Sequence, residues 1–242
     1  MSKRADVVLV EEKYFETRAR AQEAIKNGQV KVNGVVIKKP SQEIEDGQKI
    51  ELAENILKYV SRGGLKLEKA IKEFKIDFDG KVVLDMGSST GGFTEVSLLN
   101  GAKKVYAVDV GTGQLHKDLL NNPKVISMEK TEIRDVGEKI FDECDIIVAD
   151  ISFISEVKIL GAIYDKISKQ NLYILIKPQF EMGAELSRKY KGVIKDYNLS
   201  KKIASQAIEQ IVTLGFSVHG ITDSPITGGD GNHEFIVWLT KK

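Results

Sequence analysis

The 242-residue sequence has little or none of several features on which some classes of protein depend. Cys144 is its one cysteine, which excludes an intramolecular disulfide and a cysteine-rich zinc site. The three histidines lack the spacing of metal ligands, so we predict no metal site. No apolar run approaches the roughly 18 residues of a membrane-spanning helix, and residues 7–10 are too short an apolar run for a signal peptide. We therefore expect a cytoplasmic protein that does not insert into membranes.

The net charge is also close to zero, because 36 Lys and Arg side chains face 35 Asp and Glu side chains. Affinity for a nucleic acid must then come from local clusters of charge. Residues 1–40 carry nine basic and five acidic side chains, whereas residues 41–57 carry one and five. Residues 58–75 are basic again, with six against two. At about 150 residues per domain, the length favours one full-sized domain and one small one.

The N-terminal block predicts two helices followed by a β-hairpin. Residues 6–12 are short and amphipathic, and residues 18–27 predict a second helix. Asn33-Gly34 then separates two alternating apolar segments, 30–32 and 35–37, and this dipeptide is a strong signal for a hairpin turn. The result is a small α+β unit at the start of the chain.

Basic and polar side chains recur at helical spacing in this block. A spacing of four places Arg18, Gln22 and Lys26 on one helix face, beside Lys31 of the hairpin. From spacing alone, this face is equally a solvated helix surface or a basic patch. The motifs around Arg4, Arg18-x-Arg20 and residues 26–34 resemble the RNA-binding module named after ribosomal protein S4. The resemblance implies that the helix and hairpin grip structured RNA through its phosphates. Together with the basic stretch that follows, the predicted RNA contacts are Arg4, Arg18, Arg20, Gln22, Lys26, Lys31, Asn33 and Arg62.

A second block begins with an apolar strand at residues 81–85, a glycine-rich loop at 87–92 and a helical run at 93–99. Loop amides at a helix N-terminus supply hydrogen-bond donors to a ligand. The G-x-x-x-G-G spacing is neither that of a dinucleotide site nor that of a P-loop, which weakens both interpretations. Asp109 ends the next strand, where a carboxylate can accept hydrogen bonds from both hydroxyls of a ribose. This combination matches S-adenosylmethionine best.

The predicted contacts of that cofactor lie in the glycine loop and at the ends of the two strands. They are Asp85, Gly87, Ser88, Ser89, Thr90, Gly91, Gly92, Phe93, Asp109 and Val110.

Alternation of strands and helices continues to the end of the chain and predicts a doubly wound α/β sheet. The last two strands have only a loop between them, so we expect the final strand to be antiparallel, as in methyltransferase sheets. The fold class is therefore a Rossmann-like class I methyltransferase sheet with a small α+β domain at its N-terminus. The further strands are predicted at residues 125–128, 145–150, 172–177, 217–221 and 235–239.

Four charged residues are predicted to meet at one edge of this sheet. Asp150 and Lys177 each follow an apolar strand, and ligands of open α/β sheets bind outside the carboxyl ends of the strands. Glu234 opens the final strand, whose antiparallel direction brings its start to the same edge. Lys66 lies in a helix before the first strand that could fold over this edge. A half-buried lysine is costly, so it should have a partner or a task.

Specific motifs are spread over nearly the whole chain, and through them the sequence resembles the TlyA family, often labelled haemolysin A. That family joins an S4 module to an FtsJ-like RNA methyltransferase domain. The resemblance implies an RNA-binding domain at 1–52, a linker at 53–60 and a methyltransferase domain at 61–242. It also implies methyl transfer from S-adenosylmethionine to a ribose 2'-hydroxyl of ribosomal RNA, with Lys66, Asp150, Lys177 and Glu234 as the catalytic set. The motifs are Ser61–Leu67, Asp85–Glu95, Asp150–Ser155, Lys177–Glu181 and Gly231–Glu234.

The reaction needs a base, because a ribose 2'-hydroxyl is a poor acid that must lose its proton as it attacks the sulfonium methyl. Lys177 is the predicted base, and a drop of three pKa units, about 4 kcal/mol, would require burial and a neighbouring cation. Lys66 would be that cation and would orient the hydroxyl, while Asp150 and Glu234 position the two amines. The carboxylates oppose the drop, so the balance stays open, and ordinary ion pairing at a sheet edge is the alternative.

Several questions remain open at this stage. Residues 182–192 depart from the glycine-rich, lysine-containing loop of the family, which puts contacts with the substrate in doubt. The short ends of the chain resemble a branch associated with cytidine in large-subunit ribosomal RNA, whereas the longer branch also modifies the small subunit. Competing functions are a cytolysin, an RNA-binding protein with an idle methyltransferase domain, and, weakest, an NAD-linked dehydrogenase. The expected partner is ribosomal RNA or a ribosomal subunit, and a monomer and a homodimer are both open.

Overall fold

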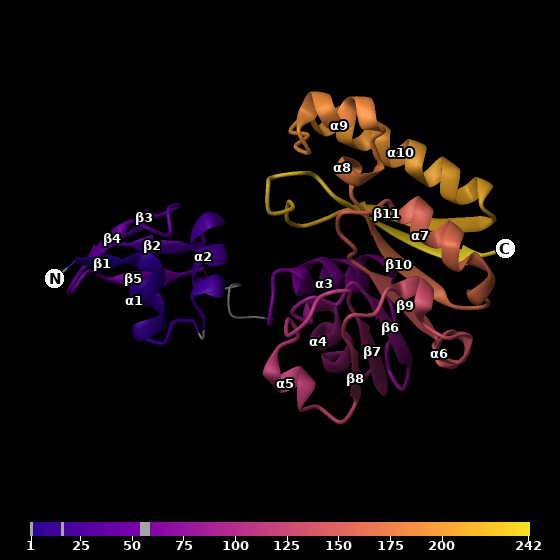
Figure 1. Cartoon of the computed structure of the whole chain (residues 1–242), viewed down its shortest axis with the longest axis horizontal. Coiled ribbons are helices and arrows are strands. Elements are labelled where there is room, and N and C mark those ends of the chain that lie inside the picture. Colours follow the sequence, from indigo (N-terminus) through magenta and orange to yellow (C-terminus); the bar gives the residue numbers. More distant parts are fainter. Residues whose placement is uncertain (1, 16, 54–58) are drawn as a thin grey trace. The chain divides into compact units, whose positions relative to one another are not determined.

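The computed structural model describes residues 2–15, 17–53 and 59–242 (Figure 1). Contacts divide the chain into two compact units, Met1–Lys58 and Tyr59–Lys242. The linker predicted at 53–60 falls mostly on residues 54–58, which lie outside the described residues. Tyr59 and Val60 pack within the second unit, where the amide of Val60 donates to Glu95 Oε2 at 2.5 Å.

The first unit contains two helices and two small antiparallel sheets. The helices and the hairpin predicted for this unit are confirmed, with the positive φ angles of Asn33 and Gly34 (50° and 78°) closing the turn. Three further strands were not predicted, because segments of three residues are too short to show an alternating pattern. The elements are β1 (Ser2–Arg4), α1 (Ala5–Glu11), α2 (Arg18–Lys26), β2 (Val30–Val32), β3 (Val35–Val36), β4 (Glu43–Glu45) and β5 (Ile50–Leu52).

Strands β3, β2 and β5 form one sheet in that order, and β1 pairs with β4 in the other. Leu9, Ile25 and Ile37 are among the fully buried side chains that join the helices to these strands. The unit therefore has a hydrophobic core of its own.

A seven-stranded sheet organises the second unit, in the order β11-β12-β10-β9-β6-β7-β8. Strands β10, β9, β6, β7 and β8 are parallel, whereas β12 runs antiparallel to both β10 and β11. The predicted doubly wound sheet and its antiparallel last strand are confirmed. The strands are β6 (Val82–Met86), β7 (Lys104–Val108), β8 (Val125–Met128), β9 (Ile146–Ala149), β10 (Asn171–Ile176), β11 (Phe216–Asp223) and β12 (Phe235–Lys241).

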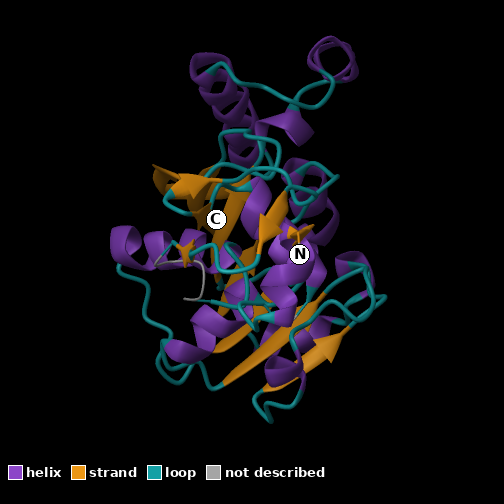
Figure 2. Cartoon of the chain, turned by 90° about the vertical axis from the view of Figure 1, so that its left-hand side faces the viewer, coloured by secondary structure: helices purple, strands orange, loops and turns teal. Residues whose placement is uncertain are grey.

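Helices cover both faces of this sheet (Figures 1 and 2). One face packs in a hydrophobic cluster that includes Phe141, Leu160 and Ile211, and the other in a cluster that includes Leu67 and Val96. Burial of both faces explains why the central strands read as continuous apolar runs. The helices are α3 (Gly63–Phe74), α4 (Gly92–Leu99), α5 (Lys117–Leu120), α6 (Glu138–Glu143), α7 (Glu156–Ile163), α8 (Pro178–Glu181), α9 (Ala184–Tyr190) and α10 (Tyr197–Thr213).

A helix that crosses a lipid bilayer must be long and almost entirely apolar. Among residues 2–15, 17–53 and 59–242, no helix is long and apolar enough to cross one.

Candidate active site

Sheet topology brings the four predicted charged residues to one edge. Asp150 follows β9 and Lys177 follows β10, and these strands are parallel neighbours. Ile176 pairs with Phe235 across the β10–β12 ladder, so the residues just beyond that pair, Lys177 and Glu234, leave the sheet side by side. Lys66 comes from the first turn of α3. Four segments far apart in the sequence thus meet at the carboxyl ends of the parallel strands.

The four side chains form an alternating line of opposite charges. Lys66 Nζ lies 2.7 Å from Glu234 Oε2 and 2.9 Å from Asp150 Oδ2, and Lys177 Nζ lies 2.6 Å from Asp150 Oδ1. The side chains are nearly enclosed, with exposed fractions of 9% for Lys66, 6% for Lys177 and 3% for Glu234. The order Glu234, Lys66, Asp150, Lys177 gives two positive and two negative groups in one buried network.

Electrostatics favour charged forms at the centre of this network. Burial alone would lower the pKa of Lys66, but the carboxylates of Asp150 and Glu234 outweigh it and raise that pKa. Burial would likewise raise the pKa of Asp150, but the ammonium groups of Lys66 and Lys177 outweigh it and lower that pKa. Lys66 is therefore a fixed cation rather than a candidate base.

Lys177 has partners that the sequence did not reveal. Its Nζ donates to Ser152 Oγ at 2.8 Å and to the backbone oxygen of Asp150 at 3.3 Å, in addition to its ion pair. Three acceptors fit the three N–H bonds of an ammonium group. Ser152 comes two residues after Asp150, and this position on a strand-end loop was the signal that could have pointed to it.

Packing within the unit explains two glycines of the loop between β6 and α4. Gly87 has a φ of 79°, and a Cβ there would lie 3.1 Å from Ile151 Cα. Gly91 has a φ of 97°, and a Cβ there would lie 2.2 Å from Leu119 Cδ1. Both positions need a left-handed backbone and leave no room for a side chain. The glycines thus hold the loop close to its neighbours, whereas the sequence suggested only close approach of a ligand.

Two carboxylates flank this loop. Asp109 Oδ2 accepts the amide of Ser89 at 2.8 Å, and Oδ1 accepts the amide of Gly111 at 2.7 Å. Each oxygen keeps a further lone pair with which to accept another hydrogen bond. Asp85 is fully buried, and burial raises its pKa to about 7. Its Oδ2 accepts from Thr94 Oγ1 at 2.6 Å, whereas its Oδ1 has no partner among the described residues.

A cavity of about 450 Å³ lies against the loop and against Asp150 of the charged network. Its size is typical of a small-molecule site. Four of the ten predicted cofactor residues line it, namely Gly87, Ser89, Asp109 and Val110. The other six are not part of its lining: Asp85, Ser88, Thr90, Gly91, Gly92 and Phe93. Asp150 is common to the cavity and the charged network. Lining residues that the sequence analysis missed are Val108, Gln114, Thr131, Glu132, Ile133, Ile151, Ser152, Phe153, Ile154 and Ile159.

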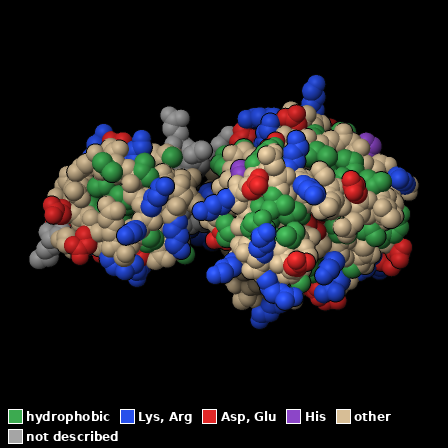
Figure 3. All heavy atoms as spheres, turned by 90° about the horizontal axis from the view of Figure 1, so that it is seen from above, with side chains coloured by type: hydrophobic (Ala, Val, Ile, Leu, Met, Phe, Trp, Pro, Cys, Tyr) green, Lys and Arg blue, Asp and Glu red, His purple; other side chains and the backbone are tan. Residues whose placement is uncertain are grey.

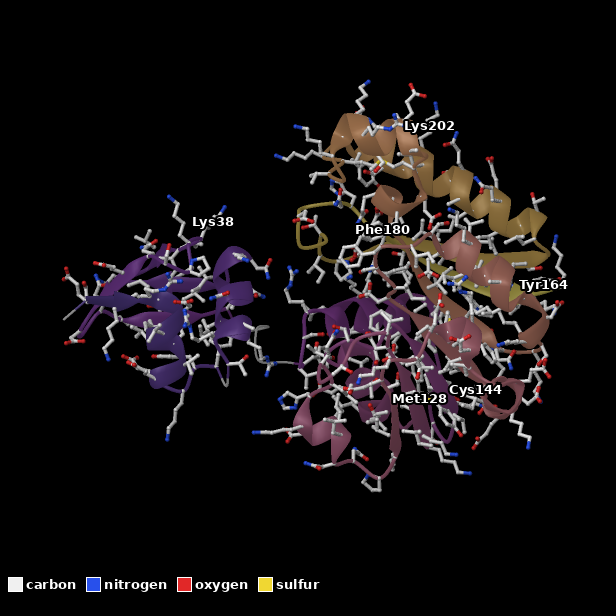
Figure 4. All side chains as sticks on the ribbon, viewed as in Figure 1. Lys38, Met128, Cys144, Tyr164, Phe180 and Lys202 are labelled. Carbon is white, nitrogen blue, oxygen red and sulfur yellow. The ribbon has the colours of Figure 1, made fainter. Side chains whose placement is uncertain are left out.

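Phe153 is an unusual member of this lining. Its side chain is 91% exposed, and its φ of 70° is rare for an aromatic residue. The ring lies 5.5 Å from that of Phe180, which follows Lys177 on α8 (Figure 4). An exposed aromatic ring packed beside a partly buried one is a surface on which a flat ligand could stack.

Predicted RNA contacts of the first unit converge on a buried carboxylate. Arg4 Nε, Arg18 Nη2 and Gln22 Nε2 lie 2.9, 2.9 and 2.6 Å from the carboxylate oxygens of Asp6, which is fully buried. Lys26 and Lys31 are exposed, and Asn33 Oδ1 accepts the amide of Lys49 in the hairpin turn. Arg20 is partly exposed on α2, and Arg62 precedes α3 in the other unit. Some of the predicted RNA contacts therefore hold the unit together through Asp6 or the hairpin turn, whereas others, such as Lys26 and Lys31, face solvent.

A metal site requires several ligating side chains that converge on one point. Within the part of the chain that the structure describes, no group of three or more His, Cys, Asp or Glu residues is arranged to hold a metal ion.

Comparison with known proteins agrees with this geometry. A family described as FtsJ-like methyltransferase matches residues 59–241, and the S4 domain family matches residues 3–50. The chain is 37% identical over 98% of its length to the 16S/23S rRNA (cytidine-2'-O)-methyltransferase TlyA of Mycobacterium tuberculosis, of which it covers 89%. It is 35% identical over 93% of its length to the 23S rRNA (cytidine-2'-O)-methyltransferase TlyA of Campylobacter jejuni, of which it covers 94%. The chain belongs to the TlyA family.

Other TlyA relatives carry a different name. Hemolysin A of Brachyspira hyodysenteriae is 44% identical over 96% of this chain and is covered to 98%. A solved structure described as a hemolysin from Streptococcus thermophilus is 40% identical to this chain, with a TM-score of 0.76. The match covers all of this chain and 89% of that structure. The TlyA architecture of an S4 domain followed by an FtsJ-like methyltransferase domain therefore extends over the whole chain.

Proposed function

We propose that this chain transfers a methyl group from S-adenosylmethionine to the ribose 2'-hydroxyl of a cytidine in large-subunit ribosomal RNA. The observation that carries the proposal is the buried network of Lys66, Asp150, Lys177 and Glu234, which shares Asp150 with the cavity beside the glycine loop. The names of the relatives from M. tuberculosis and C. jejuni have 23S rRNA and cytidine 2'-oxygen in common. These two arguments support the reaction and the class of substrate, respectively.

The residues around the cavity fit S-adenosylmethionine. When bound, this cofactor supplies an electrophilic methyl group on a positively charged sulfur. Asp109 would accept hydrogen bonds from the ribose hydroxyls with the lone pairs that Ser89 and Gly111 leave free. The unpartnered Asp85 Oδ1 behind the loop offers a further acceptor for the polar end of the cofactor. Val110 and Ile133 supply apolar wall for the adenine.

The charged network provides the chemistry that the hydroxyl requires. Lys66 stays protonated and donates to the attacking oxygen, whose negative charge grows as the proton leaves. Lys177, held by Asp150 and Ser152, accepts that proton on its amine nitrogen. Asp150 holds both amines in place from its two oxygens, and Glu234 holds Lys66 from the other side. Phe153 and Phe180 supply a platform for the target base next to this network.

Methyl-labelled S-adenosylmethionine tests the proposal directly. The purified chain is incubated with separate small and large ribosomal subunits, and nuclease digestion then maps the label. We expect label on a cytidine ribose of the large-subunit RNA. Cofactor binding without label on any ribosomal substrate would point instead to an idle domain. Because the name Hemolysin A occurs at 44% identity, the same preparation is also tested on red blood cells, where lysis without methyl transfer would overturn the proposal.

Cofactor binding is tested separately with Asp109. We expect Asp109→Ala to weaken the affinity for S-adenosylmethionine about tenfold or more, because a charged hydrogen-bond acceptor is lost. Asp109→Asn keeps an acceptor for only one of the two loop amides, so its affinity should lie between those of wild type and Asp109→Ala. Isothermal titration gives the Kd, with the exposed Asp142→Ala as the matched control. An unchanged Kd would count against the ribose contact.

A further inference from the structure

A small lobe follows the catalytic lysine and carries an unbalanced charge. Residues 183–202, here called the basic lobe, comprise α9, the turn after it and the start of α10. Met182, Ile194 and Ile203 form a hydrophobic cluster of their own beneath it. The lobe includes most of residues 182–192, which depart from the family pattern and were left without a function.

Six cations of the basic lobe face solvent. They stand against two carboxylates, a net formal charge of +4. Within the described residues, none of the six takes part in an ion pair, although Lys189 Nζ lies 5.5 Å from the ring centre of Tyr190. In Figure 3, which looks down on this face of the unit, Lys and Arg side chains project from the surface, and Figure 4 labels Lys202 there. The six are Arg188, Lys189, Lys191, Lys195, Lys201 and Lys202.

Both carboxylates of the lobe already serve its helices. Glu185 lies in the first turn of α9. Asp196 caps α10 and accepts the amides of Asn198 and Leu199 at 2.9 and 3.2 Å. Acidic groups at helix N-termini stabilise the helix. The negative charges therefore have a structural role. Arg188, Lys189 and Lys191 favour the C-terminal end of α9 in the same way, whereas the other three cations lie at neither end of a helix where they would do so.

Two lysines on α3 of the same unit are, in contrast, paired with carboxylates. On α3, Lys69 pairs with Glu73 and Lys72 pairs with Glu68, each at a spacing of four. Between β8 and β9, residues 129–145 carry seven acidic and three basic side chains, a net charge of −4. The basic lobe is therefore a positively charged surface in a unit that also carries an acidic segment between β8 and β9.

Two attachments tie the lobe to the catalytic edge. On one side, only α8 separates it from Lys177. On the other, Asn232 is buried, its Oδ1 accepts the amide of Ile194 at 2.7 Å, and its Nδ2 donates to the oxygen of Gly192 at 3.1 Å. Asn232 lies two residues before Glu234 of the charged network. A ligand on the lobe is therefore held at a set position relative to the reacting groups.

We propose that the basic lobe binds the phosphate backbone of the RNA next to the target ribose and so positions that ribose at Lys177. The inference rests on the proposed function and adds a second RNA-binding surface to the S4 domain. Exposed, unpaired cations on a fixed scaffold bind phosphates by releasing counterions, which requires no sequence readout. The lobe thus contributes affinity and orientation, whereas the cavity and the network select the reaction.

Binding is tested first, with purified large-subunit ribosomal RNA as the probe. The triple variant Lys189→Gln, Lys195→Gln, Lys202→Gln removes three unpaired charges. The matched control Lys103→Gln, Lys124→Gln, Lys139→Gln removes three exposed charges around the amino ends of the strands. We expect the lobe variant to bind at least tenfold more weakly near 0.1 M salt, with a slope of log K against log salt reduced by about two to three. Equal losses in both variants would overturn the proposal.

Kinetics then separate the lobe from the catalytic site. We expect the lobe variant to raise KM for RNA at least tenfold, while kcat and the Kd of S-adenosylmethionine stay within about twofold of the wild-type values. An unchanged KM for RNA, with methylation intact, would overturn the proposal that the lobe binds RNA and would leave the proposed function standing. An acidic protein would then be the next candidate ligand of the lobe. If the wild-type chain methylates no ribosomal RNA, the proposed function fails. The salt slope still decides whether the lobe binds RNA.

Discussion

Each unit of the chain surrounds one carboxylate with positively charged side chains, but the two arrangements differ in origin and in the exposure of those side chains. In the S4 unit, Asp6 receives Arg4 and Arg18, which are two and twelve residues away and remain about half exposed, at 48% and 54%. In the methyltransferase unit, Asp150 receives Lys66 and Lys177, which are 84 and 27 residues away and are 9% and 6% exposed.

That difference contrasts a structural cluster with the one that we propose to be reactive. Half-exposed guanidinium groups remain hydrated, so the Asp6 cluster holds α1 and α2 together at modest cost. Two nearly enclosed ammonium groups lose most of their hydration, and a fold gains little stability from such an arrangement. Burial of this kind is therefore typical of groups that act on a substrate. The predictions below test the contrast, from the largest effect to the smallest.

Lys177→Met should remove catalysis and leave the fold intact. Loss of a general base lowers kcat at least about a thousandfold, while the Kd of S-adenosylmethionine stays nearly the same because Lys177 is not part of the described cavity lining. Single-turnover methyl transfer measures the effect, with Trp238 fluorescence reporting on the fold and the exposed Lys69→Met as the control. Turnover within tenfold of the wild-type value would show that Lys177 is not the base.

Asp6→Asn should destabilise the S4 unit and spare the chemistry. Removal of the charge that Arg4 and Arg18 share should cost about 2–3 kcal/mol, a value reduced because both partners are half exposed. Hydrogen bonding by Arg4 is the main cause that lowers the pKa of Asp6, and burial opposes it. The stabilisation is thus present above about pH 4 and is lost as the pH falls further.

Hydrogen exchange of the intact chain measures that loss, because amides of the two units are read separately. Exposed Glu45→Gln is the control in the same unit. Equal protection of residues 17–53 in Asp6→Asn and wild type would show that the cluster does not stabilise the fold.

Glu156 is a buried carboxyl group that, unlike Asp6 and Asp150, forms no ion pair within the described residues. It is 1% exposed, and neither of its carboxylate oxygens has a hydrogen-bond partner among the described residues. Burial raises its pKa to about 8, so the wild-type chain loses stability as the pH rises from about 4.5 to 8. Glu156→Gln cannot ionise, and it should be more stable than wild type by about 2 kcal/mol at pH 8, an advantage that disappears near pH 4.5.

Urea unfolding followed by Trp238 fluorescence at both pH values checks this expectation, with exposed Glu138→Gln as the reference. A stability difference that does not change with pH would contradict the assigned cause.

Lys26→Ala should give the smallest effect and should act on RNA alone. Lys26 is exposed at the end of α2 and forms no ion pair within the described residues. We expect affinity for ribosomal RNA to fall a few-fold and the salt slope to fall by about one, with no change in the unfolding curve. Filter binding measures both, and Arg18→Ala, which also removes a partner of Asp6, should in contrast lower stability.

Much of this architecture could be predicted from local patterns. Strand ends at Asp150 and Lys177, the glycine loop and the Asn33-Gly34 turn are short-range signals, and each lies where the pattern indicated. Strands β1, β4 and β5 of the S4 unit were missed because they are short and no turn signal joins them to their pairing partners, which lie far along the chain. Ser152 and Phe153 were missed because nothing in a loop sequence states which way its side chains point.

The sequence by itself determined the family, the order of the elements and the four charged residues, since these depend on periodicity and on motifs that neighbouring residues carry. Tertiary structure alone decided the partners. It joined Lys66 to both Asp150 and Glu234, turned Arg4 and Arg18 toward Asp6, and tied Asn232 to the basic lobe. Ion pairs and hydrogen bonds form between groups that packing brings within about 3 Å, and packing depends on contacts between distant segments, which no single segment encodes.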